Sequence, residues 1–224
     1  EHVRAMNDAA TRFSLTSAGH SDTLEGVVRI TASEAISTYL LPPIVGELRR
    51  LHPGIEVELV ATNEPSDLTR READIAIRNF RPQDPDLFAK KLTDNDAWLY
   101  ASSALLDRVG RPGAPADLAE WAEIAAFDES DMMLDYLRGI GIELSQKNFP
   151  IRTRSHLLQW ELCKRGVVMC FMMADVGDAE PLVERVLGEG DPPIAFPSWL
   201  TCHRELKTSR RLRVVFDLLA DRLG

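Results

Sequence analysis

The sequence predicts an α/β protein built from two lobes. Strand-like and helix-like segments alternate along most of the 224 residues, an order typical of α/β architecture with mostly parallel strands. Turn signals gather after residue 102, and the chain returns to a strand and a long amphipathic helix near residue 200. We therefore expect a second lobe inserted into the first, with lobe I at 24–100 plus 199–224, lobe II at 101–198, and a half-sized sheet in each.

Composition indicates a soluble protein with a proper core, since 45% of residues are hydrophobic and 27% are charged. No segment approaches the roughly 20 apolar residues that span a bilayer, and no signal peptide is recognisable at the start. We expect a cytoplasmic protein without membrane contact. The net charge of −9 makes this chain by itself a poor ligand for DNA, which attracts clustered Lys and Arg. One basic cluster, 203–213, is interpreted as a solvated surface.

The three cysteines, Cys163, Cys170 and Cys202, are odd in number and form no CxxC pair. This pattern favours neither a disulfide framework nor a zinc site. The neighbours of Cys163 and Cys170 are apolar, so we expect small buried hydrophobic residues in a reducing compartment.

The first lobe begins after a helix-permissive stretch at 1–13 and a polar linker at 14–23. Its helical pattern steps by four from Ile36 to Leu48, with Pro42 and Pro43 predicting a short turn and a kink before a main helix ending near Leu51. The predicted strands are 27–31, 55–60, 74–78, 88–92 and 97–101, with a short helix at 65–71.

The second lobe contains a helix at 157–165, for which Ser155 is the predicted N-cap and Gly166 the stop. The apolar run 167–173 predicts a strand covered on both faces, and its methionines have no partner that the sequence identifies. The other predicted helices are 115–121, 132–138, 181–187 and 209–223, and the other predicted strands are 124–127, 149–153 and 198–203.

Ligands of open α/β sheets bind at the carboxyl ends of strands, where helix N-termini offer unpaired N–H groups and a partial positive charge. This rule selects polar residues that directly follow predicted strands. The predicted ligand-binding residues are Ser33, Glu34, Asn63, Arg78, Asn79, Asp128, Arg154 and Ser155.

Each of these residues also has a structural interpretation. Ser33 and Ser155 suit helix caps, Asn63 suits a turn, and Arg78 suits an ion pair with an acidic neighbour. Arg152 and Arg154 share side-chain parity on a strand, and their common face can point away from a ligand. His203 is expected to be structural, and Phe196 and Trp199 to be packing residues. If Glu34 and Asp128 do lie beside arginines, a zwitterionic or amine-bearing ligand is favoured over a bare dicarboxylate.

Enzyme motifs are absent from the sequence, which contains no GxSxG, HExxH, P-loop or GxGxxG. The five histidines have no metal-ligand spacing. We expect no enzyme, no catalytic residue, no metal and no cofactor.

Four passages resemble the effector-binding domain of LysR-type transcriptional regulators. They are 24–59, which includes LEGVVRI, LLP and HPGIEVEL; 68–78, which ends in ADIAIR; 155–168; and 199–223. The resemblance implies two Rossmann-like lobes joined by two crossover strands, a type II periplasmic-binding-protein-like fold, with the ligand in a cleft between the lobes. The winged helix-turn-helix domain of the family is not in this sequence, and 1–13 looks like the end of the linker helix that follows it.

The function that the resemblance implies is effector sensing in a bacterial transcription regulator. The effector would be a small, carboxylate-bearing molecule, and DNA would be bound only through the missing N-terminal domain. The implied assembly is a homodimer or homotetramer with helix 36–51 of one copy against helix 157–165 of another. The alternative is a solute-binding protein that feeds a transporter; the lack of an export signal and the preceding helix and linker favour the regulator.

Overall fold

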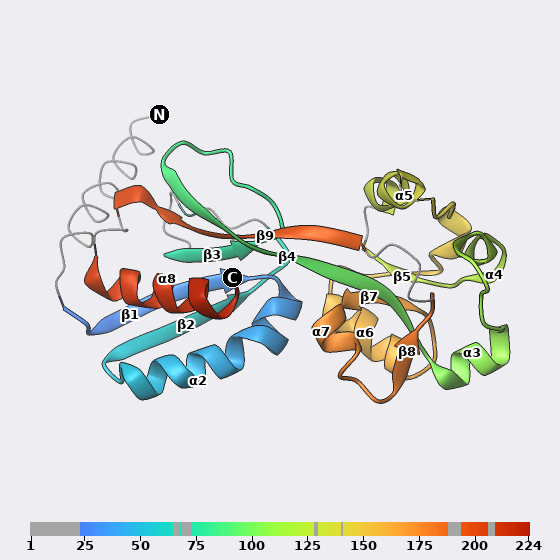
Figure 1. The fold of residues 1–224 in the computed structure, drawn as a ribbon, viewed down its shortest axis with the longest axis horizontal. Coiled ribbons are helices and arrows are strands. Elements are labelled where there is room, and N and C mark those ends of the chain that lie inside the picture. The colour runs from blue at the N-terminus through green and yellow to red at the C-terminus, as the bar shows by residue number, and fades with distance from the viewer. Residues whose placement is uncertain are drawn as a thin grey trace. The chain divides into compact units, whose positions relative to one another are not determined.

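The computed structural model describes residues 23–64, 68, 73–127, 130–139, 141–187, 194–205 and 209–224. The chain divides into two compact units, which Figure 1 shows as ribbons. Unit 1 takes the described residues up to Asp94 together with Pro197–Gly224, and unit 2 is Asn95–Phe196. The predicted helix at 1–13, most of the linker at 14–23 and the predicted helix at 65–71 lie outside the described residues, apart from Thr23 and Leu68.

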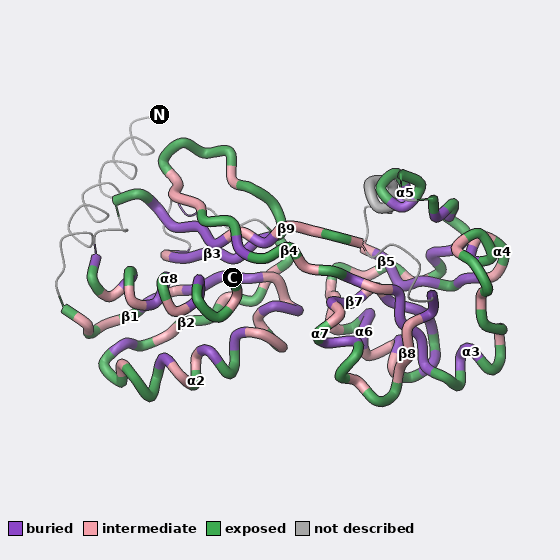
Figure 2. The backbone as a smooth tube through the Cα atoms, viewed as in Figure 1, coloured by how far each residue is buried: buried purple, intermediate pink, exposed green. Residues whose placement is uncertain are grey.

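Unit 1 is built on three parallel strands, β1 (Gly26–Ala32), β2 (Ile55–Ala61) and β3 (Ile75–Arg78). β1 lies between the other two, with Ala32 opposite both Ala61 and Ile77. All four residues of β3 are buried, as Figure 2 shows. The strand β9 (Ile194–His203) pairs with β3 in the antiparallel direction, so the sheet of this unit is mixed.

The first helical segment changes its winding at the two prolines. A π-helix at Ile36–Leu40 runs directly into α2 (Leu41–Leu51), whose first turn contains Pro42 and Pro43. Because proline has no N–H to donate to the preceding turn, the hydrogen-bond pattern of the helix is interrupted at this point. The structure has a π-to-α transition where the sequence predicted a short turn and a kink, and α2 ends at Leu51 as predicted.

The last helix, α8 (Arg210–Arg222), packs its apolar stripe into unit 1 and contacts α2 and β1. Leu212, Val215, Phe216 and Leu219 are buried along this stripe, as the helical spacing predicts. Arg222, in the last turn of α8, fastens this helix to α2, because its Nε and Nη2 donate to the two carboxylate oxygens of Glu47 at 2.8 Å each.

Unit 2 has one hydrophobic core that collects buried residues from most of its elements, including Leu106, Leu118, Ile124 and Phe149. Its helices and strands are β4 (Leu87–Ser102, which begins in unit 1), α3 (Ser103–Val109), α4 (Leu118–Trp121), β5 (Ala125–Ala126), α5 (Ser130–Gly139), β6 (Ile151–Arg152), α6 (His156–Lys164), β7 (Cys170–Met173), α7 (Ala174–Gly177) and β8 (Val183–Arg185). Short 3-10 helices occupy Pro115–Asp117 and Gln146–Asn148.

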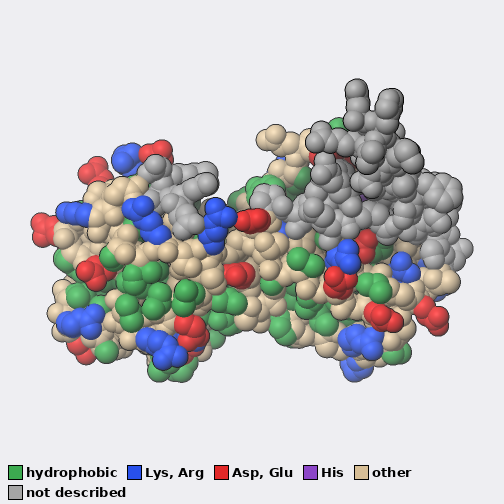
Figure 3. Space-filling model, turned by 180° about the vertical axis from the view of Figure 1, so that it is seen from behind, with side chains coloured by type: hydrophobic (Ala, Val, Ile, Leu, Met, Phe, Trp, Pro, Cys, Tyr) green, Lys and Arg blue, Asp and Glu red, His purple; other side chains and the backbone are tan. Residues whose placement is uncertain are grey.

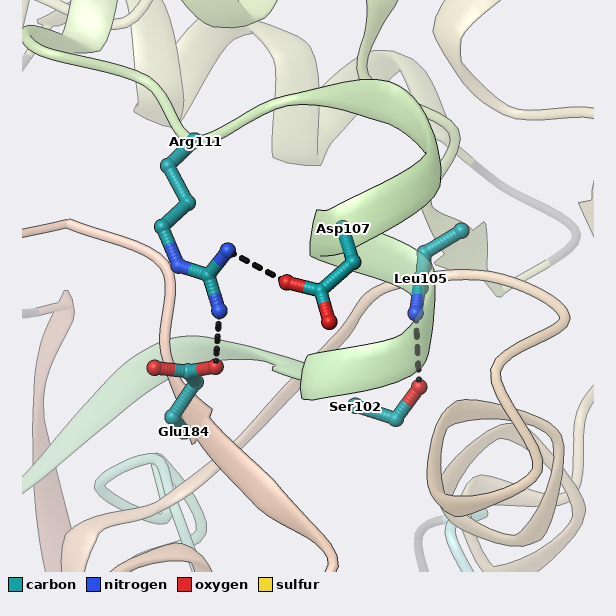
Figure 4. Close-up of polar contacts among 5 residues, drawn as sticks. All are labelled: Ser102, Leu105, Asp107, Arg111 and Glu184. Carbon is teal, nitrogen blue, oxygen red and sulfur yellow. Dashed lines mark hydrogen bonds and ion pairs between the residues drawn. The ribbon is translucent and has the colours of Figure 1, made fainter.

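The turn that follows β4 is fixed by polar contacts that Figure 4 shows in close-up. The Ser102 hydroxyl accepts from the backbone N–H of Leu105 at 3.2 Å and so caps α3. Arg111, just beyond α3, donates to Asp107 at 2.7 Å and to Glu184 of β8 at 2.9 Å. These contacts tie the end of α3 to β8 within unit 2.

Three of the predicted elements differ from the structure. The two strands expected at 88–92 and 97–101 are one 16-residue strand, β4; its exposed polar middle, 93–96, remains extended because β4 pairs with β9 and β7, and pairing overrides weak strand propensity. The helix expected at 181–187 contains instead the strand β8, in which Arg185 lies opposite Tyr100. Helical spacing over seven residues did not distinguish the two structures.

The expected pair of half-sized, mostly parallel sheets is also wrong. Among the described residues, one hydrogen-bonded path runs β2-β1-β3-β9-β4-β7, with β8 on β4, and β5 and β6 form a separate parallel pair. The pairs β3–β9, β4–β7 and β4–β8 are antiparallel. The path is continuous because β4 and β9 run from one unit into the other without a break.

The cysteines are free and buried, as the sequence predicted. Burial raises the pKa of the Cys163 thiol to about 12 and that of the Cys170 thiol well above its usual value, so both thiols stay protonated at neutral pH. The methionine-rich strand β7 pairs with β4, where Met172 lies opposite Trp98 and Met173 opposite Ala97.

The surface mixes charges of both signs. On the face drawn in Figure 3, basic and acidic side chains are interspersed, and no large basic area gathers among the described residues. None of the helices in the described part of the chain is long and apolar enough to cross a membrane.

Candidate ligand-binding site

The carboxyl ends of β1, β2 and β3 bring polar residues together at one edge of the unit 1 sheet. Parallel pairing places Ala32, Ala61 and Ile77 side by side, so the residues that follow them share this edge. We call six polar residues at or next to these strand ends the strand-end cluster: Thr31, Ser33, Glu34, Asn63, Glu64 and Arg78.

Arg78 is the most buried charged residue of the cluster, with 8% of its surface exposed. Its Nη2 donates to the Thr31 hydroxyl at 2.8 Å and to the Glu64 carbonyl at 3.1 Å, and its Nη1 donates to the carbonyl of Ile77 at 3.2 Å. Burial lowers the pKa of this guanidinium, since a low-dielectric setting disfavours its charged form. These three acceptors are neutral oxygen atoms.

Thr31 lies near the end of β1, the strand between β2 and β3, and its hydroxyl is a hydrogen-bond partner of Arg78. It is fully buried, and its hydroxyl donates to the carbonyl of Val60 at 3.0 Å while it accepts from Arg78. Thr31 was not among the ligand-binding residues predicted from the sequence. The sequence feature that could have identified Thr31 is its hydroxyl, which lies on the same side of the strand as Ser33.

Glu34 and Asn63 bond to each other across the ends of β1 and β2. The Asn63 amide nitrogen donates to the Glu34 carboxylate at 3.2 Å, and the Glu34 backbone N–H donates to the Asn63 side-chain oxygen at 3.1 Å. Glu34 is only partly buried.

Ser33 and Asn79 have few side-chain contacts in the structure. The Ser33 hydroxyl accepts from the backbone N–H of Ile36 at 3.5 Å, which is a weak helix cap. Asn79 follows Arg78 at the end of β3 and is exposed, and its side chain has no hydrogen bond to any other described residue. Both stay predicted ligand contacts.

In unit 2 the predicted residues lie at the start of α6. Ser155 caps this helix by accepting from the Leu158 N–H at 3.3 Å, so its structural interpretation is confirmed. Arg154 is exposed beside it. Arg152 is also exposed and bonds to Gln146, whereas Asp128 lies outside the described residues.

Neighbouring aromatic residues and histidines have structural contacts. His156 Nε2 bonds to the carbonyl of Phe171 at 2.8 Å, and its ring lies 5.7 Å from that of Phe127. His203 is buried in unit 1 and its Nδ1 accepts from the N–H of Glu205 at 3.3 Å. The guanidinium of Arg81 lies 5.4 Å from the ring centroid of Trp199. The described residues contain no group of three or more His, Cys, Asp or Glu arranged to hold a metal ion.

Comparison with known proteins identifies the family. The LysR substrate binding domain model matches residues 21–224. The HTH-type transcriptional activator AaeR of Escherichia coli K12 is 26% identical over 204 residues, which are 88% of this chain and 64% of AaeR. The chain thus spans about two thirds of the length of such curated relatives.

Solved structures show the same fold. The regulatory domain of CrgA, a LysR-type regulator from Neisseria meningitidis, aligns with a TM-score of 0.79 at 24% identity, covering 89% of this chain and all of that one. Full-length AphB of Vibrio cholerae aligns at 0.74 with 16% identity, covering 99% of this chain and 77% of AphB. The fold is the type II periplasmic-binding-protein-like fold that the sequence predicted, and the chain belongs to the LysR substrate-binding domain family.

Proposed function

We propose that this chain is the effector-binding part of a bacterial LysR-type transcription regulator, and that its strand-end cluster binds a small carboxylate-bearing ligand. The observation on which this proposal rests is the buried guanidinium of Arg78 at a strand end of a domain that matches this family over 21–224. A guanidinium is suited to an incoming carboxylate, which it can bind with two parallel hydrogen bonds.

The second charge of the cluster narrows the class of ligand. Glu34 presents a partly exposed carboxylate held by Asn63, and an ammonium group is its complement. We therefore propose an amino acid or another amine-bearing acid as effector. Arg154 and Ser155 of unit 2 stay predicted ligand contacts. No residue is assigned a catalytic role, and the relatives named above are transcription regulators, which does not favour a transporter's solute-binding protein.

The mechanism we propose is a population shift. A ligand moves an equilibrium between two conformations only by the difference in its affinity for them. In the longer protein this shift would change how DNA-binding domains are presented in a dimer or tetramer. DNA contact is proposed for a helix-turn-helix part outside this sequence, in keeping with the net charge of −9 here.

Titration calorimetry against amino acids and against plain aromatic and aliphatic acids tests the site. Arg78→Gln removes the proposed carboxylate partner and Glu34→Gln the proposed ammonium partner. Each should weaken binding of the best amino acid at least about tenfold, because a hydrogen bond to a charged group contributes about 1.5–3 kcal/mol. Arg111→Gln, in an exposed ion pair of unit 2, is the matched control. Unchanged affinity in both site variants, or binding of plain acids alone, contradicts the proposal.

For the assembly we propose antiparallel pairing of α2 of one copy with α6 of another. Leu51 of α2 and Leu158 of α6 are each 49% exposed, so the proposed pairing would remove apolar surface of both helices from water. Light scattering at micromolar concentration should find a dimer or tetramer, and Leu158→Glu should yield monomers. Leu182→Glu, at a residue that is 59% exposed outside both helices, should not. A wild-type chain that is only monomeric refutes the pairing.

A further inference from the structure

A cavity of about 240 Å³ lies in unit 1 between α8 and the strands β3, β9 and β4. Its inner walls are apolar and buried. Ile75 and Cys202 are opposite each other in the β3–β9 pair and so point to the same face of the sheet. Leu212 and Phe216 lie one turn apart on α8 above them, and all four residues are at most 8% exposed.

An aromatic side chain from β4 completes the wall. Phe88 is half-buried, and its ring centroid lies 5.6 Å from that of Phe216 with the two planes tilted by 48°. Two aromatic side chains therefore form part of the cavity wall. Aromatic pairs of this tilted kind accept a third ring by the same offset and edge-on geometries.

Three charged residues, Lys90, Arg213 and Asp217, line the same cavity. Lys90 shares its strand parity with Phe88, and Arg213 and Asp217 stand one turn apart on α8. All three are exposed, and none is within 4 Å of an oppositely charged group in the described part of the chain. Two cations against one carboxylate leave this cavity lining positive, in a protein whose net charge is −9.

The volume sets the size of the occupant. Protein interiors are packed to crystal density with few voids larger than a water molecule, and a dry apolar cavity of about 150 Å³ is enough to bind benzene. A space of about 240 Å³ is smaller than the pockets of drug-sized ligands, which start near 300 Å³. It therefore fits one ring with a short side chain.

We propose that this α8 cavity is a second ligand site, which binds a monocyclic monocarboxylate with the ring against the Phe88 and Phe216 side chains and the carboxylate toward Lys90 and Arg213. The site is separate from the strand-end cluster, because Ile75 begins β3 and Arg78 ends it. It goes beyond the effector site proposed above. Its lining includes residues of β4 and β9, the two strands that continue from unit 1 into unit 2.

The test is a titration of the chain, labelled with ¹³C at Ile and Leu methyl groups, with phenylacetate and with its neutral analogue 2-phenylethanol. Phenylacetate should give saturable shifts at Ile75 and Leu212 and leave Ile124, in the core of unit 2, unmoved. Lys90→Gln and Arg213→Gln change exposed side chains. Each should lower the affinity for phenylacetate about tenfold, whereas the affinity for 2-phenylethanol should change less than about twofold. Lys147→Gln, an exposed lysine of unit 2, should change neither.

Three results overturn the proposal. The first is no saturable shift at Ile75 and Leu212 up to tens of millimolar phenylacetate. The second is phenylacetate affinity that neither charge variant changes, or that merely equals the affinity for 2-phenylethanol. The third is loss of the Ile75 shifts in Arg78→Gln, which would mean that the cavity is not a separate site. Failure of the strand-end proposal alone leaves the Ile75 and Leu212 shifts intact, so the two proposals fail independently.

Discussion

The backbone of Gly177 lies against the ring of Tyr100, so that a Cβ added at Gly177 would stand 2.1 Å from the ring carbon Cζ. Gly177 ends the short helix α7, and Tyr100 lies on β4 with 1% of its surface exposed. The Tyr100 hydroxyl then donates to Asp178 at 2.9 Å, and Arg185 donates to the same carboxylate. One aromatic ring thereby joins β4, α7 and β8.

Gly177→Ala should destabilise the protein by about 1–3 kcal/mol or more, because a rigid ring stands where the methyl group must go. Urea unfolding measures the change. Gly46→Ala is the matched control, since a Cβ on this exposed residue of α2 meets nothing within 4 Å. Gly46→Ala should raise the free energy of unfolding by up to about 1 kcal/mol, because alanine has a higher helix propensity than glycine. Equal effects of the two substitutions would refute the contact.

The Tyr100 phenol gives stability a dependence on alkaline pH. Burial, and secondarily the hydrogen bond to Asp178, raise its pKa to about 12 from an ordinary value of 10.0. The folded state therefore holds this proton more tightly than the unfolded state. Its contribution is complete below pH 10 and is lost as pH rises toward 12.

Tyr100→Phe should remove this dependence, so its free energy of unfolding should fall less between pH 10 and 12 than that of the wild type. At pH 7 the variant should lose about 1–2 kcal/mol with the hydroxyl's hydrogen bond. Urea unfolding across this pH range measures both effects. Tyr136→Phe, at a phenol that is 41% exposed, provides the control, and parallel pH profiles for wild type and Tyr100→Phe would contradict the assignment.

Thr31→Val tests how firmly the strand-end cluster is held. The substitution keeps the shape of the side chain but removes the hydroxyl that joins Arg78 to the carbonyl of Val60. We expect the free energy of unfolding, measured with urea, to fall by about 1–3 kcal/mol, because the buried Arg78 and the partly buried carbonyl of Val60 each lose a hydrogen bond. Val27→Thr, the reverse change at an exposed position of the same strand, should change the free energy of unfolding by no more than about 0.5 kcal/mol. A neutral Thr31→Val would show that the cluster is not held by this hydroxyl.

Ser102 and Arg111, which Figure 4 draws together, should differ in their effect on stability. Ser102→Ala removes a buried helix cap and should cost about 1 kcal/mol. Arg111→Ala removes two ion pairs whose side chains are between 42% and 69% exposed, so its cost should stay below about 1 kcal/mol. Thermal unfolding of both variants decides the order, and a larger loss in Arg111→Ala would contradict it.

Rules that depend on neighbouring residues were sufficient to predict several elements of unit 1 and one helix cap of unit 2. The buried stripe of α8, the end of α2 after the proline pair, and Ser155 at the start of α6 all follow from spacing and capping chemistry that act within a few residues. The family likeness of the ordered passages gave the fold class, which the regulatory domain of CrgA confirms.

The sequence by itself determined which segments are apolar enough to be buried and which polar residues follow strands, because these properties depend on near neighbours. Only the tertiary structure decided that 93–96 continues a strand, that 183–185 pairs with β4, and that Thr31 meets Arg78 across 47 positions. Strand pairing and buried polar contacts join residues that are distant along the chain, and no local periodicity encodes such partners.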